Sequence, residues 1–408
     1  METLAIILAG GKGSRLDLLS DRRSKPAMPF AGKFRIIDFT LSNCSNSGIY
    51  DIAILTQYLP LSLNEHIGAG KPWDLDRRDS SITLLQPHAQ WYEGTADAVL
   101  KNIRFIKRRN PKYILILSGD HIYKMNYRMM IKEHEEKNAD LTIASTHVPL
   151  ADANRFGILT TDNNNQVIEF EEKPRNPKSN RASMGIYIFN AGALYDALEN
   201  AQAHESDFGQ HIIPKLIAEQ KRTVFAYDFE GYWKDVGTID SYLETSLELL
   251  DKEKGTLDLY DTKWKIHTRS EELPPVKIGD NATIKNSLIS NGSIIEGTVI
   301  NSILSPGVYV GKNSVVKDSV IFNFTYIGEN VTIDKSIIDK KVVVGNNTKI
   351  GFGKTYTRNI EKPDLLFSGI NVIAKHAVIP SDTIIERNCR IFDTAYFNSK
   401  QIKSGSTL

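Results

Sequence analysis

A repeat of 17 residues in the last third of the chain limits the possible folds more than any other feature. Three consecutive segments align, each with an aliphatic-Gly pair at its second and third positions and Asn at its fifth: Tyr309–Thr325, Tyr326–Val342 and Val343–Asn359. An aliphatic residue recurs near every sixth position, and Gly or Asn stands where the chain must turn. Antiparallel hairpins would not keep a fixed period. Stacked coils of three short strands with inward aliphatics do, so we predict a parallel β-helix.

The chain before this repeat alternates short aliphatic runs with amphipathic patterns. The runs expected to be strands are Leu4–Leu8, Ile52–Leu55, Tyr113–Leu117, Leu141–Ala144 and Ile186–Phe189, and the expected helices are Ala96–Arg109, Tyr127–Glu136 and Ser241–Leu250. Such alternation predicts an α/β domain with a mostly parallel sheet, which binds ligands at the carboxyl ends of its strands. We therefore divide the 408 residues into an α/β domain (1–251), a linker (252–275) and a β-helix domain (276–408).

Charge and cysteine content exclude several classes of protein. Fifty Lys and Arg against 49 Asp and Glu leave a formal charge of +1, so no global field attracts nucleic acid or a membrane surface. Two cysteines, Cys44 and Cys389, provide neither a disulfide framework nor a Cys-based zinc site, which fits a reducing cytoplasm. The short apolar run at the N-terminus lacks a basic flank, and we expect it to be a buried strand rather than a signal peptide.

The first predicted strand leads into a glycine-rich stretch, AGGKGSRL (9–16). Gly10, Gly11 and Gly13 allow a tight bend whose backbone N–H groups can face an oxyanion, and Arg15 adds positive charge. Lys25 follows in the segment KPA. The spacing matches neither a Walker A loop nor a dinucleotide fingerprint, so this is a different kind of phosphate loop.

Two aspartates are candidate metal ligands. Asp120 follows the buried run Tyr113–Leu117, and Asp235 lies in YWKDVGT (232–238). Mg²⁺ typically takes one or two protein carboxylates and completes its shell with phosphate oxygens and water. Helix capping or ion pairing explains either aspartate equally well when it is taken alone. Together with the glycine loop they favour a metal-assisted phosphate site.

Two further motifs supply possible ligand contacts. Lys173, at the end of a predicted strand and before proline, is a suitable point charge for a phosphate, although a solvated edge lysine is the simpler interpretation. Gly94 and Thr95 open a predicted helix and could direct backbone donors at a base or phosphate. Thr95 acting only as the helix N-cap is an equally good explanation.

In this order the motifs resemble the ADP-glucose pyrophosphorylase (glucose-1-phosphate adenylyltransferase) family of bacterial glycogen and plant starch synthesis. The stretches that carry the resemblance are LAGGKGSRL (8–16), KPAMPFAGKFRIIDFTLSNCSNSGI (25–49), WYEGTADAV (91–99), SGDHIYKMNY (118–127), FEEKP (170–174), SMGIYIF (183–189), DFG (207–209) and YWKDVGT (232–238). The resemblance implies a Rossmann-like nucleotidyltransferase domain followed by a left-handed parallel β-helix of hexapeptide-like repeats. It also implies a Mg²⁺-dependent reaction of ATP with α-D-glucose 1-phosphate that yields ADP-glucose and pyrophosphate.

By similarity, specific residues take specific roles. Gly10, Gly11, Gly13 and Arg15 would hold the triphosphate, Lys25 would neutralise charge near the α-phosphate, and Asp120 with Asp235 would hold the metal. The residues that match the family's glucose 1-phosphate contacts are Tyr92, Gly157, Glu172, Lys173 and Ser183, with Tyr187, Asp207, Phe208 and Trp233 at further positions of the sugar pocket.

The resemblance is less complete for regulation. Gln57 and Trp91 match positions linked to communication between effector and substrate sites, and Lys33 matches an effector-binding lysine. Glu93 replaces the Arg or Gln of many members, and Tyr50-Asp51 replaces a basic pair found in some regulated ones. Because nearby positive charge is lost, we expect weaker binding of a phosphorylated activator.

The residues also leave other functions open. The chain could use UTP, dTTP or GTP, or it could be a non-catalytic regulatory subunit of the same assembly. An acyltransferase is a further alternative, since β-helices often serve that chemistry, with His376 as its candidate base. We expect a homotetramer, possibly joined by a paralogous subunit. Ile321, Phe322, Phe324 and Tyr326 would supply part of the interface, or would pack on the α/β domain of the same chain.

Overall fold

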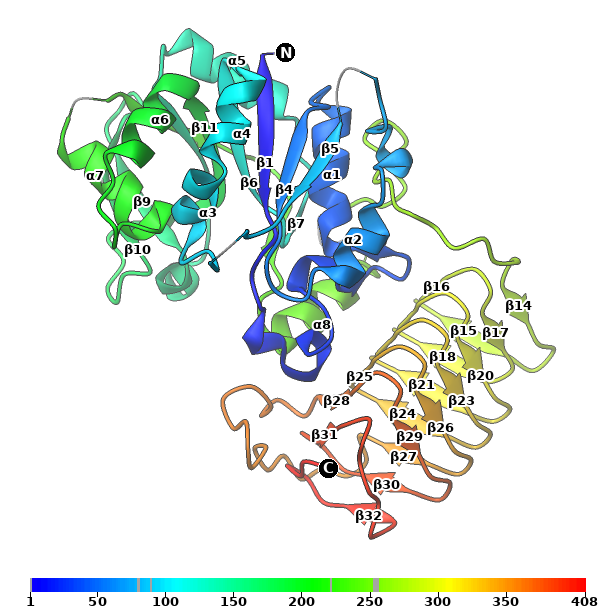
Figure 1. Ribbon diagram of the computed structural model, residues 1–408. Helices are drawn as coiled ribbons and strands as arrows, with labels where there is room; N and C mark the ends of the chain where they lie inside the picture. The colour runs from blue at the N-terminus through cyan, green and yellow to red at the C-terminus, as the bar shows by residue number, and fades with distance from the viewer. Residues whose placement is uncertain (1, 79–80, 89, 221, 252–256) are drawn as a thin grey trace.

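A mixed sheet with a parallel centre organises the first part of the protein (Figure 1). The computed structural model describes residues 2–78, 81–88, 90–220, 222–251 and 257–408. The strands in spatial order are β10 (Val167–Glu172), β9 (Gly157–Thr161), β11 (Arg181–Asn190), β6 (Tyr113–Ser118), β1 (Thr3–Leu8), β4 (Ile52–Leu55) and β5 (Ile82–Leu85), with β8 (Leu141–His147) beside β11 and β12 (Val224–Asp228) beside β8. Strands β6, β1, β4 and β5 are parallel, whereas β11 pairs antiparallel with its neighbours. The predicted α/β domain is confirmed.

Helices cover both faces of this sheet (Figure 1). They are α1 (Ile36–Asn46), α2 (Leu61–Ile67), α3 (Thr95–Lys101), α4 (Ile103–Arg109), α5 (Tyr127–Glu136), α6 (Ala191–Glu199), α7 (Ile213–Ala218) and α8 (Ile239–Glu248). Short 3₁₀ turns span Ser14–Ser20, Lys25–Ala27, Lys71–Trp73 and Leu150–Arg155, and a π-turn spans Phe208–Ile212. Among the described residues, no helix is both long and apolar enough to cross a membrane.

The prediction of one helix over Ala96–Arg109 is wrong, because the structure divides it at Asn102. Asn102 has φ −107° and ψ 11°, outside the helical region, and its side-chain amide donates to the carbonyl of Ala98 and the hydroxyl of Tyr92. A side chain that bonds its own backbone competes with the helical ladder. The predicted helix over Tyr127–Glu136 is confirmed.

The second part is a parallel β-helix, as predicted, whose strands form three sheets within the described residues. The first sheet contains β14 (Lys277–Ile278), β17 (Ile294–Ile295), β20 (Tyr309–Val310), β23 (Tyr326–Ile327), β26 (Val343–Val344) and β29 (Val378–Ile379). The second contains β15 (Thr283–Lys285), β18 (Thr298–Ile300), β21 (Val315–Lys317), β24 (Thr332–Asp334), β27 (Lys349–Ile350), β30 (Ile384–Ile385) and β32 (Gln401–Ile402). The third contains β16 (Leu288–Ile289), β19 (Ile303–Leu304), β22 (Val320–Ile321), β25 (Ser336–Ile338), β28 (Asn371–Ile373) and β31 (Arg390–Ile391).

Stacking of identical positions holds the coils together. Val299, Val316, Ile333 and Ile350 lie in register, fully or almost fully buried, in one column of the coil interior. At a corner, the side-chain amide of Asn313 donates to Asn330, 17 residues later in the chain. The 17-residue spacing therefore positions both the aliphatic columns and the hydrogen-bonded ladders.

The third predicted repeat, Val343–Asn359, follows the pattern only as far as Ile350. Residues 351–370 leave the coil, and the chain returns to the third sheet at Asn371, opposite Ser336. One earlier corner, between β17 and β18, is two residues shorter, since Ile294 pairs with Tyr309 whereas Lys277 pairs with Ile294 at the 17-residue spacing. Excursions and shorter corners are compatible with the stack because only the strand positions must align.

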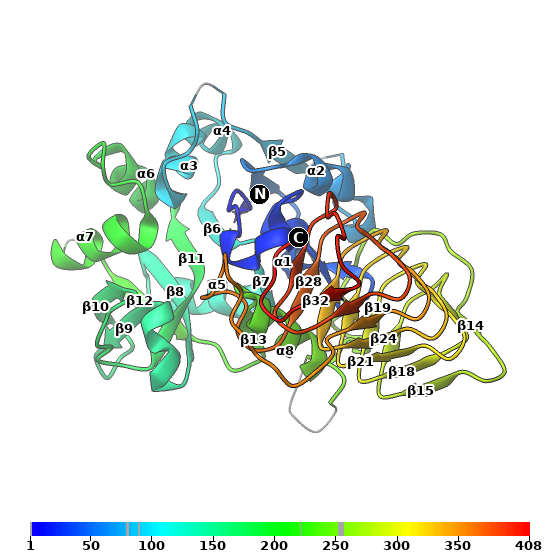
Figure 2. The same ribbon diagram turned by 90° about the horizontal axis from the view of Figure 1, so that it is seen from below.

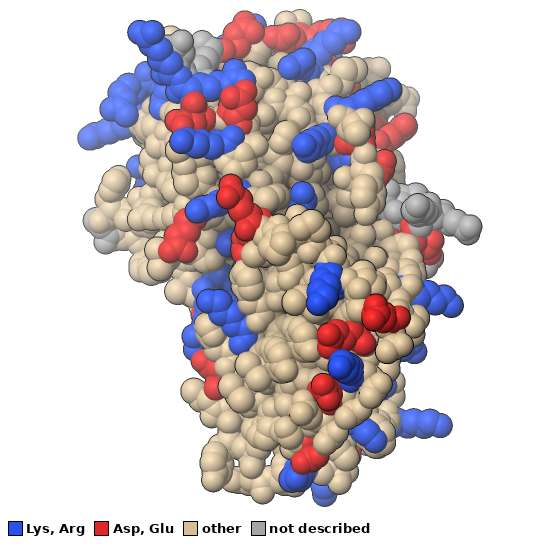
Figure 3. Space-filling view, turned by 90° about the vertical axis from the view of Figure 1, so that its right-hand side faces the viewer, with Lys and Arg blue, Asp and Glu red and all other residues tan. Residues whose placement is uncertain are grey.

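The three outer faces of the β-helix differ in chemistry. The third sheet places Ile303, Val320, Ile337 and Val372 in one outward row, and this row packs on the α/β domain. The second sheet carries mainly polar and charged residues in its outward rows. The first sheet presents an outward row of apolar residues, exposed except for the half-buried Tyr309, that we name the apolar stripe: Ile294, Tyr309, Tyr326, Val343 and Val378. Figure 3 shows basic and acidic side chains interspersed, in keeping with the near-zero net charge.

The four residues named as candidate interface positions have different surroundings. Ile321 is buried in the coil interior, and Phe322 packs edge-on against Tyr242 of α8, with ring centroids 6.2 Å apart. Phe322 therefore packs on the α/β domain of its own chain, which was the alternative to a place in a subunit interface. Phe324 and Tyr326 remain exposed.

The connection between the two parts follows α1 closely. The first five residues of the predicted linker, 252–256, lie outside the described residues. Farther along, Trp264 donates its indole N–H to Asn43, and Ser42 accepts from the backbone N–H of His267. The connection is thus hydrogen-bonded to the α/β domain.

Candidate active site

A cavity of about 620 Å³ opens at the carboxyl ends of the central parallel strands. Leu8 at the end of β1, Leu55 at the end of β4 and Ser118 at the end of β6 line its floor. The predicted site residues that line it are Gly10, Gly11, Gly13, Arg15, Lys25, Gln57, Tyr92, Gly94, Thr95, Asp120, Glu172, Lys173, Tyr187, Asp207 and Phe208. Segments from the whole α/β domain therefore meet in one pocket.

The glycine loop passes directly over Lys25. Gly13 has φ +68°, and a Cβ there would lie 3.0 Å from the Cβ of Lys25, so both backbone conformation and space favour glycine. Ser20 closes the following turn, because its hydroxyl donates to the carbonyl of Gly13 at 2.9 Å. The loop and Lys25 therefore form a single packed unit.

Lys25 bridges the two predicted metal ligands. Its ammonium lies 2.7 Å from Asp235 Oδ1 and 3.0 Å from Asp120 Oδ2. Burial alone would lower the pKa of Lys25, but the two carboxylates outweigh it and the net pKa is raised. Burial would likewise raise the pKa values of Asp120 and Asp235, but the charge of Lys25 lowers both. All three groups are therefore ionised at neutral pH.

Pairing between two short strands brings the aspartates together. β7 (His121–Tyr123) and β13 (Trp233–Asp235) are antiparallel, with Asp235 directly opposite His121. Ligand atoms of Asp120, His121 and Asp235 lie within 4.8 Å of one another, which makes this a possible metal-binding group. The Nδ1 atom of His121 is buried and has no hydrogen-bond partner among the described residues. Asp120 lines the cavity and Asp235 lies beside it, and two neighbouring carboxylates at such a cavity fit a divalent cation with oxygen ligands.

The opposite wall of the cavity contains the predicted sugar-phosphate residues. Lys173 follows β10 with φ +50°, and its exposed ammonium lies 2.6 Å from Glu172 Oε1. Gly157 lies behind Glu172, since a Cβ there would be 2.9 Å from Glu172 Oε2. Ser183 accepts from the backbone N–H of Gly185 and lies 3.5 Å from the hydroxyl of Tyr187. Burial raises the pKa of Tyr187, so its hydroxyl stays protonated.

The start of α3 differs from the interpretation of Thr95 as the helix N-cap, whereas Gly94 and Thr95 both line the cavity. Thr95 is not the N-cap, which is Gly94, and the hydroxyl of Thr95 donates to Asp207 and accepts from the N–H of Phe208. The carbonyl of Ser206 accepts from the N–H groups of residues 96 and 97. Those two donors are therefore occupied by protein, and Thr95 joins the helix start to the DFG segment.

Six predicted site residues do not line this cavity, namely Asp235, Gly157, Ser183, Trp233, Trp91 and Lys33. Trp233 stacks edge-on against His121, with centroids 5.1 Å apart, and therefore supports the cavity from behind. Trp91 is largely exposed and, with Gln57, lines a smaller cavity. Gln57 also bonds both backbone groups of Tyr92 and contacts the glycine loop. Lys33 lines a separate cavity beside the β-helix. Exposed His376, the candidate base of an acyltransferase, occupies a turn of the β-helix.

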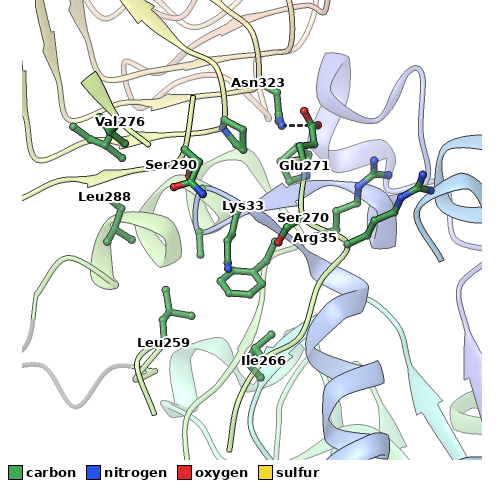
Figure 4. Close-up of a pocket in the computed structure, with 18 of the residues that line it drawn as sticks. Lys33, Arg35, Leu259, Ile266, Ser270, Glu271, Val276, Leu288, Ser290 and Asn323 are labelled. Atoms are coloured by element: carbon green, nitrogen blue, oxygen red, sulfur yellow. Dashed lines mark hydrogen bonds between the residues drawn. The ribbon is translucent and has the colours of Figure 1, made fainter. Parts of the chain in front are cut away.

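Lys33 lines a second cavity, of about 660 Å³, between the α/β domain and the β-helix (Figure 4). Arg35, Arg269 and Lys340 line it too, and Glu271 is an acidic neighbour hydrogen-bonded to Asn323. Burial and the nearby Arg35 and Arg23 lower the pKa of Lys340 to about 7. Positive charge near Lys33 thus comes from Arg35, Arg269 and Lys340, even though Tyr50-Asp51 lacks the basic pair found in some regulated family members.

Sequence reasoning missed several residues of the site. Ser118 donates its hydroxyl to Asp120, His121 joins the aspartates, and Gly237 lies between Arg15 and Asp235. All three are within two residues of a predicted ligand, so adjacency was the available signal. Gly185 also lines the cavity. Its backbone has a φ of +66°, which the sequence did not predict.

Comparisons with known proteins agree with this geometry. Residues 4–252 match the family described as Nucleotidyl transferase, and residues 274–373 match the one described as GlmU-like, C-terminal hexapeptide. The chain is 52% identical over 394 residues to the glucose-1-phosphate adenylyltransferase of Clostridium perfringens strain 13, with 94% of this chain and 96% of that protein covered. It is 51% identical over 410 residues to the enzyme of the same name from Thermosipho africanus, with 98% of each chain covered.

Proposed function

The chain belongs to the glucose-1-phosphate adenylyltransferase family, and we propose that its 620 Å³ cavity joins ATP to α-D-glucose 1-phosphate, giving ADP-glucose for glycogen synthesis and pyrophosphate. One observation carries this proposal. The glycine loop, Asp120, the buried Lys25 and the strand-end Lys173 all line one cavity, and Asp235 lies 2.7 Å from the ammonium of Lys25. Such a cavity offers separate positive regions to two phosphorylated substrates.

We place the triphosphate of ATP at Gly10, Gly11, Gly13 and Arg15, and the phosphate of the sugar at Lys173. Support comes from the order of the strands, because the glycine loop follows the central strand β1 whereas Lys173 follows β10 at the edge of the sheet. Tyr92, Gly157, Glu172, Ser183, Tyr187, Asp207, Phe208 and Trp233 would then form or support the glucose pocket. Within it Glu172 holds the ammonium of Lys173, and Tyr187 keeps a protonated hydroxyl as a donor.

Asp120 and Asp235 would hold Mg²⁺, with His121 beside them. When bound, the cation supplies charge neutralisation at the phosphates, which is its usual contribution to phosphoryl and nucleotidyl transfer. Because Lys25 now pairs with both aspartates, we infer that its ammonium turns towards the α-phosphate when the carboxylates take another cationic partner.

The reaction requires no general base from the protein. The attacking phosphate oxygen is already anionic, and the barrier comes from bringing it to a phosphorus inside a tetra-anionic nucleotide. Lys25 stays cationic because its pKa is raised, and Arg15 adds a second positive charge at the loop. Lys173 holds the attacking group in place, so it contributes through proximity.

We further propose that Lys33 belongs to an effector site and that Gln57 and Trp91 connect it to catalysis. Lys33 shares its cavity with Arg35 and Lys340, a setting that suits a phosphorylated ligand. Gln57 contacts the glycine loop and holds the backbone of Tyr92, which lines the substrate cavity.

The apolar stripe supports a homo-oligomer, which we propose to be a tetramer, with or without a paralogous subunit. Its Tyr309 and Tyr326 rings stack in parallel 4.8 Å apart, and Val378 is 61% exposed. Exposed apolar rows of this kind mark interaction surfaces. Light scattering would show a multiple of the monomer mass, reduced by Tyr326→Glu and unaffected by the control Thr332→Glu on the neighbouring polar face. A monomeric wild type would contradict the proposal.

The test of function uses the purified chain alone, with Mg²⁺, ATP and glucose 1-phosphate, and measures pyrophosphate. No turnover by folded chain would favour a regulatory subunit, and faster turnover with UTP, dTTP or GTP would favour another nucleotidyltransferase. We expect the enzyme in the cytoplasm, an environment that suits its buried thiols Cys44 and Cys389.

A further inference from the structure

The segment between the two cationic residues of the glycine-loop region is held by the β-helix. Residues 16–24 connect Arg15 to Lys25, and both of these residues line the cavity. In Figures 1 and 2 this blue segment, which follows β1, lies against the orange and red coils near the C-terminus. The part of the β-helix that it contacts is more than 300 residues away in sequence.

A bidentate ion pair fixes the start of the segment. Arg390 donates from Nε to Asp17 Oδ2 at 2.5 Å and from Nη2 to Asp17 Oδ1 at 2.9 Å. Arg390 is 5% exposed and Asp17 is 7% exposed. The third guanidinium nitrogen, Nη1, donates to Glu361 at 2.7 Å. This geometry fixes the orientation of both side chains, as parallel guanidinium–carboxylate bonds do.

The position of Arg390 departs from the pattern of its own row. The outward row of the third sheet is aliphatic for five coils and ends in Val372, whose register partner in the last coil is Arg390. Apolar packing between the two domains does not explain an arginine at this position. The buried carboxylate of Asp17, which pairs with Arg390, does explain it.

Asp17 itself has an unfavourable backbone. Its φ of 51° with ψ of −129° interrupts the 3₁₀ turn Ser14–Ser20 and lies in a region that residues other than glycine seldom adopt. Such conformations persist only where the surroundings over-determine them, and they often occur next to functional sites. At Asp17 the paired guanidinium of Arg390 holds the backbone in this conformation. The candidate active site is close by, because Arg15, two residues earlier, lines the cavity.

A second pair of reversed polarity fixes the end of the segment. Arg23 donates from Nη2 to both oxygens of Asp339, at 2.9 and 2.8 Å, and both side chains are almost fully buried. Arg23 is two residues before Lys25, and Asp339 follows β25. The segment is therefore held at both ends, close to Arg15 and to Lys25.

We propose that Arg390 is a positioning residue for catalysis: through Asp17 the last coils of the β-helix hold the glycine loop in the conformation that receives the triphosphate. Arg390 does not line the cavity and acts through the loop alone. The proposal rests on the proposed function, because it concerns the ATP side of that cavity.

The test compares steady-state kinetics and ATP binding in four variants of the full chain. Arg390→Gln removes the pair, and Arg390→Lys keeps one charge-assisted bond. Asp17→Gly combined with Arg390→Leu removes both charges, relieves the backbone conformation and restores an aliphatic residue to the row. The control is Arg387→Gln, because Arg387 pairs with Asp334 inside the β-helix, away from the segment.

We expect Arg390→Gln to raise the KM and the Kd for ATP roughly tenfold, with the KM for glucose 1-phosphate within about twofold of wild type. Arg390→Lys should recover part of the loss. The double variant should unfold at a higher temperature than Arg390→Gln yet keep the raised ATP values, which a purely structural role would not produce. This variant also decides the matter if Arg390→Gln does not fold.

Normal ATP values in the double variant, or an equal change in Arg387→Gln, would overturn the proposal. So would a parallel rise in both KM values. Wild-type turnover of ATP and glucose 1-phosphate, measured in the same series, tests the proposed function separately. An inactive wild type would refute the function, whereas an active wild type with insensitive variants would refute only the positioning role.

Discussion

Lys25→Met tests the central electrostatic feature of the cavity, the ammonium between two aspartates. The substitution leaves the carboxylates of Asp120 and Asp235 facing each other without a cation. Removing one partner of a fully buried pair costs about 3–5 kcal/mol, and because 32% of the Asp120 side chain is exposed we expect about 2–3 kcal/mol here. At roughly 2–4 °C per kcal/mol, the melting temperature without divalent cation should fall by roughly 4–12 °C.

Mg²⁺ should reverse much of this loss, because a bound divalent cation replaces the missing charge and stabilises the folded state by mass action. The assay is thermal unfolding of wild type and variant, each in EDTA and in saturating Mg²⁺. Lys124→Met is the matched control, since its ammonium pairs with Asp261 outside the cavity, and its deficit should not respond to Mg²⁺. An equal deficit of Lys25→Met in both buffers would refute the reasoning.

The same variant predicts a pH dependence. The pKa of Lys25 is raised, so its contribution is complete below its ordinary pKa and is lost only above the raised value. The pKa values of Asp120 and Asp235 are lowered, so their contribution is complete above their ordinary range near 4 and is lost as pH falls below it. The deficit in EDTA should therefore be constant between about pH 5 and 9 and shrink in acid.

Three other substitutions test the metal ligands, the sugar-phosphate contact and the anion site near Lys33. Asp120→Asn should lower kcat roughly a thousandfold with an unchanged circular dichroism spectrum, and retention of more than about a tenth of wild-type kcat would exclude the metal assignment. Lys173→Ala should raise the KM for glucose 1-phosphate about tenfold or more, since a charge-assisted contact contributes about 1.5–3 kcal/mol, and a rise confined to ATP would reverse the two pockets. Calorimetric binding of sulfate near Lys33 should weaken from pH 6 to 8, because sulfate stays dianionic in this range while Lys340, with its pKa of about 7, loses its charge. Binding should become insensitive to pH in Lys340→Met, and the opposite trend in wild type would exclude an anion site there.

Local periodicity made the β-helix predictable, because every coil repeats the same inward aliphatic and corner positions. The excursion over residues 351–370 has no period, so nothing in the sequence marks Ile350 as the last regular position before it. The break at Asn102 depends on a hydrogen bond to Tyr92, a contact that the helical pattern does not contain.

Most residues that line the cavity belong to motifs that the sequence singled out, but their arrangement could not be predicted. Asp120 and Asp235 are far apart in sequence, and only the antiparallel pairing of β7 with β13 brings them together. The cation between the two aspartates is the ammonium of Lys25. Lys25 reaches them because it packs against Gly13 of the glycine loop. Long-range pairs such as Asp17 with Arg390 arise from the docking of two domains, which no local pattern encodes.

Pyrophosphate release by the purified chain tests the central claim most directly. With Mg²⁺, ATP and glucose 1-phosphate, we expect pyrophosphate and ADP-glucose in equal amounts, faster than with UTP, dTTP or GTP, and little of either without the sugar phosphate. Folded chain that releases no pyrophosphate from ATP and glucose 1-phosphate would contradict it.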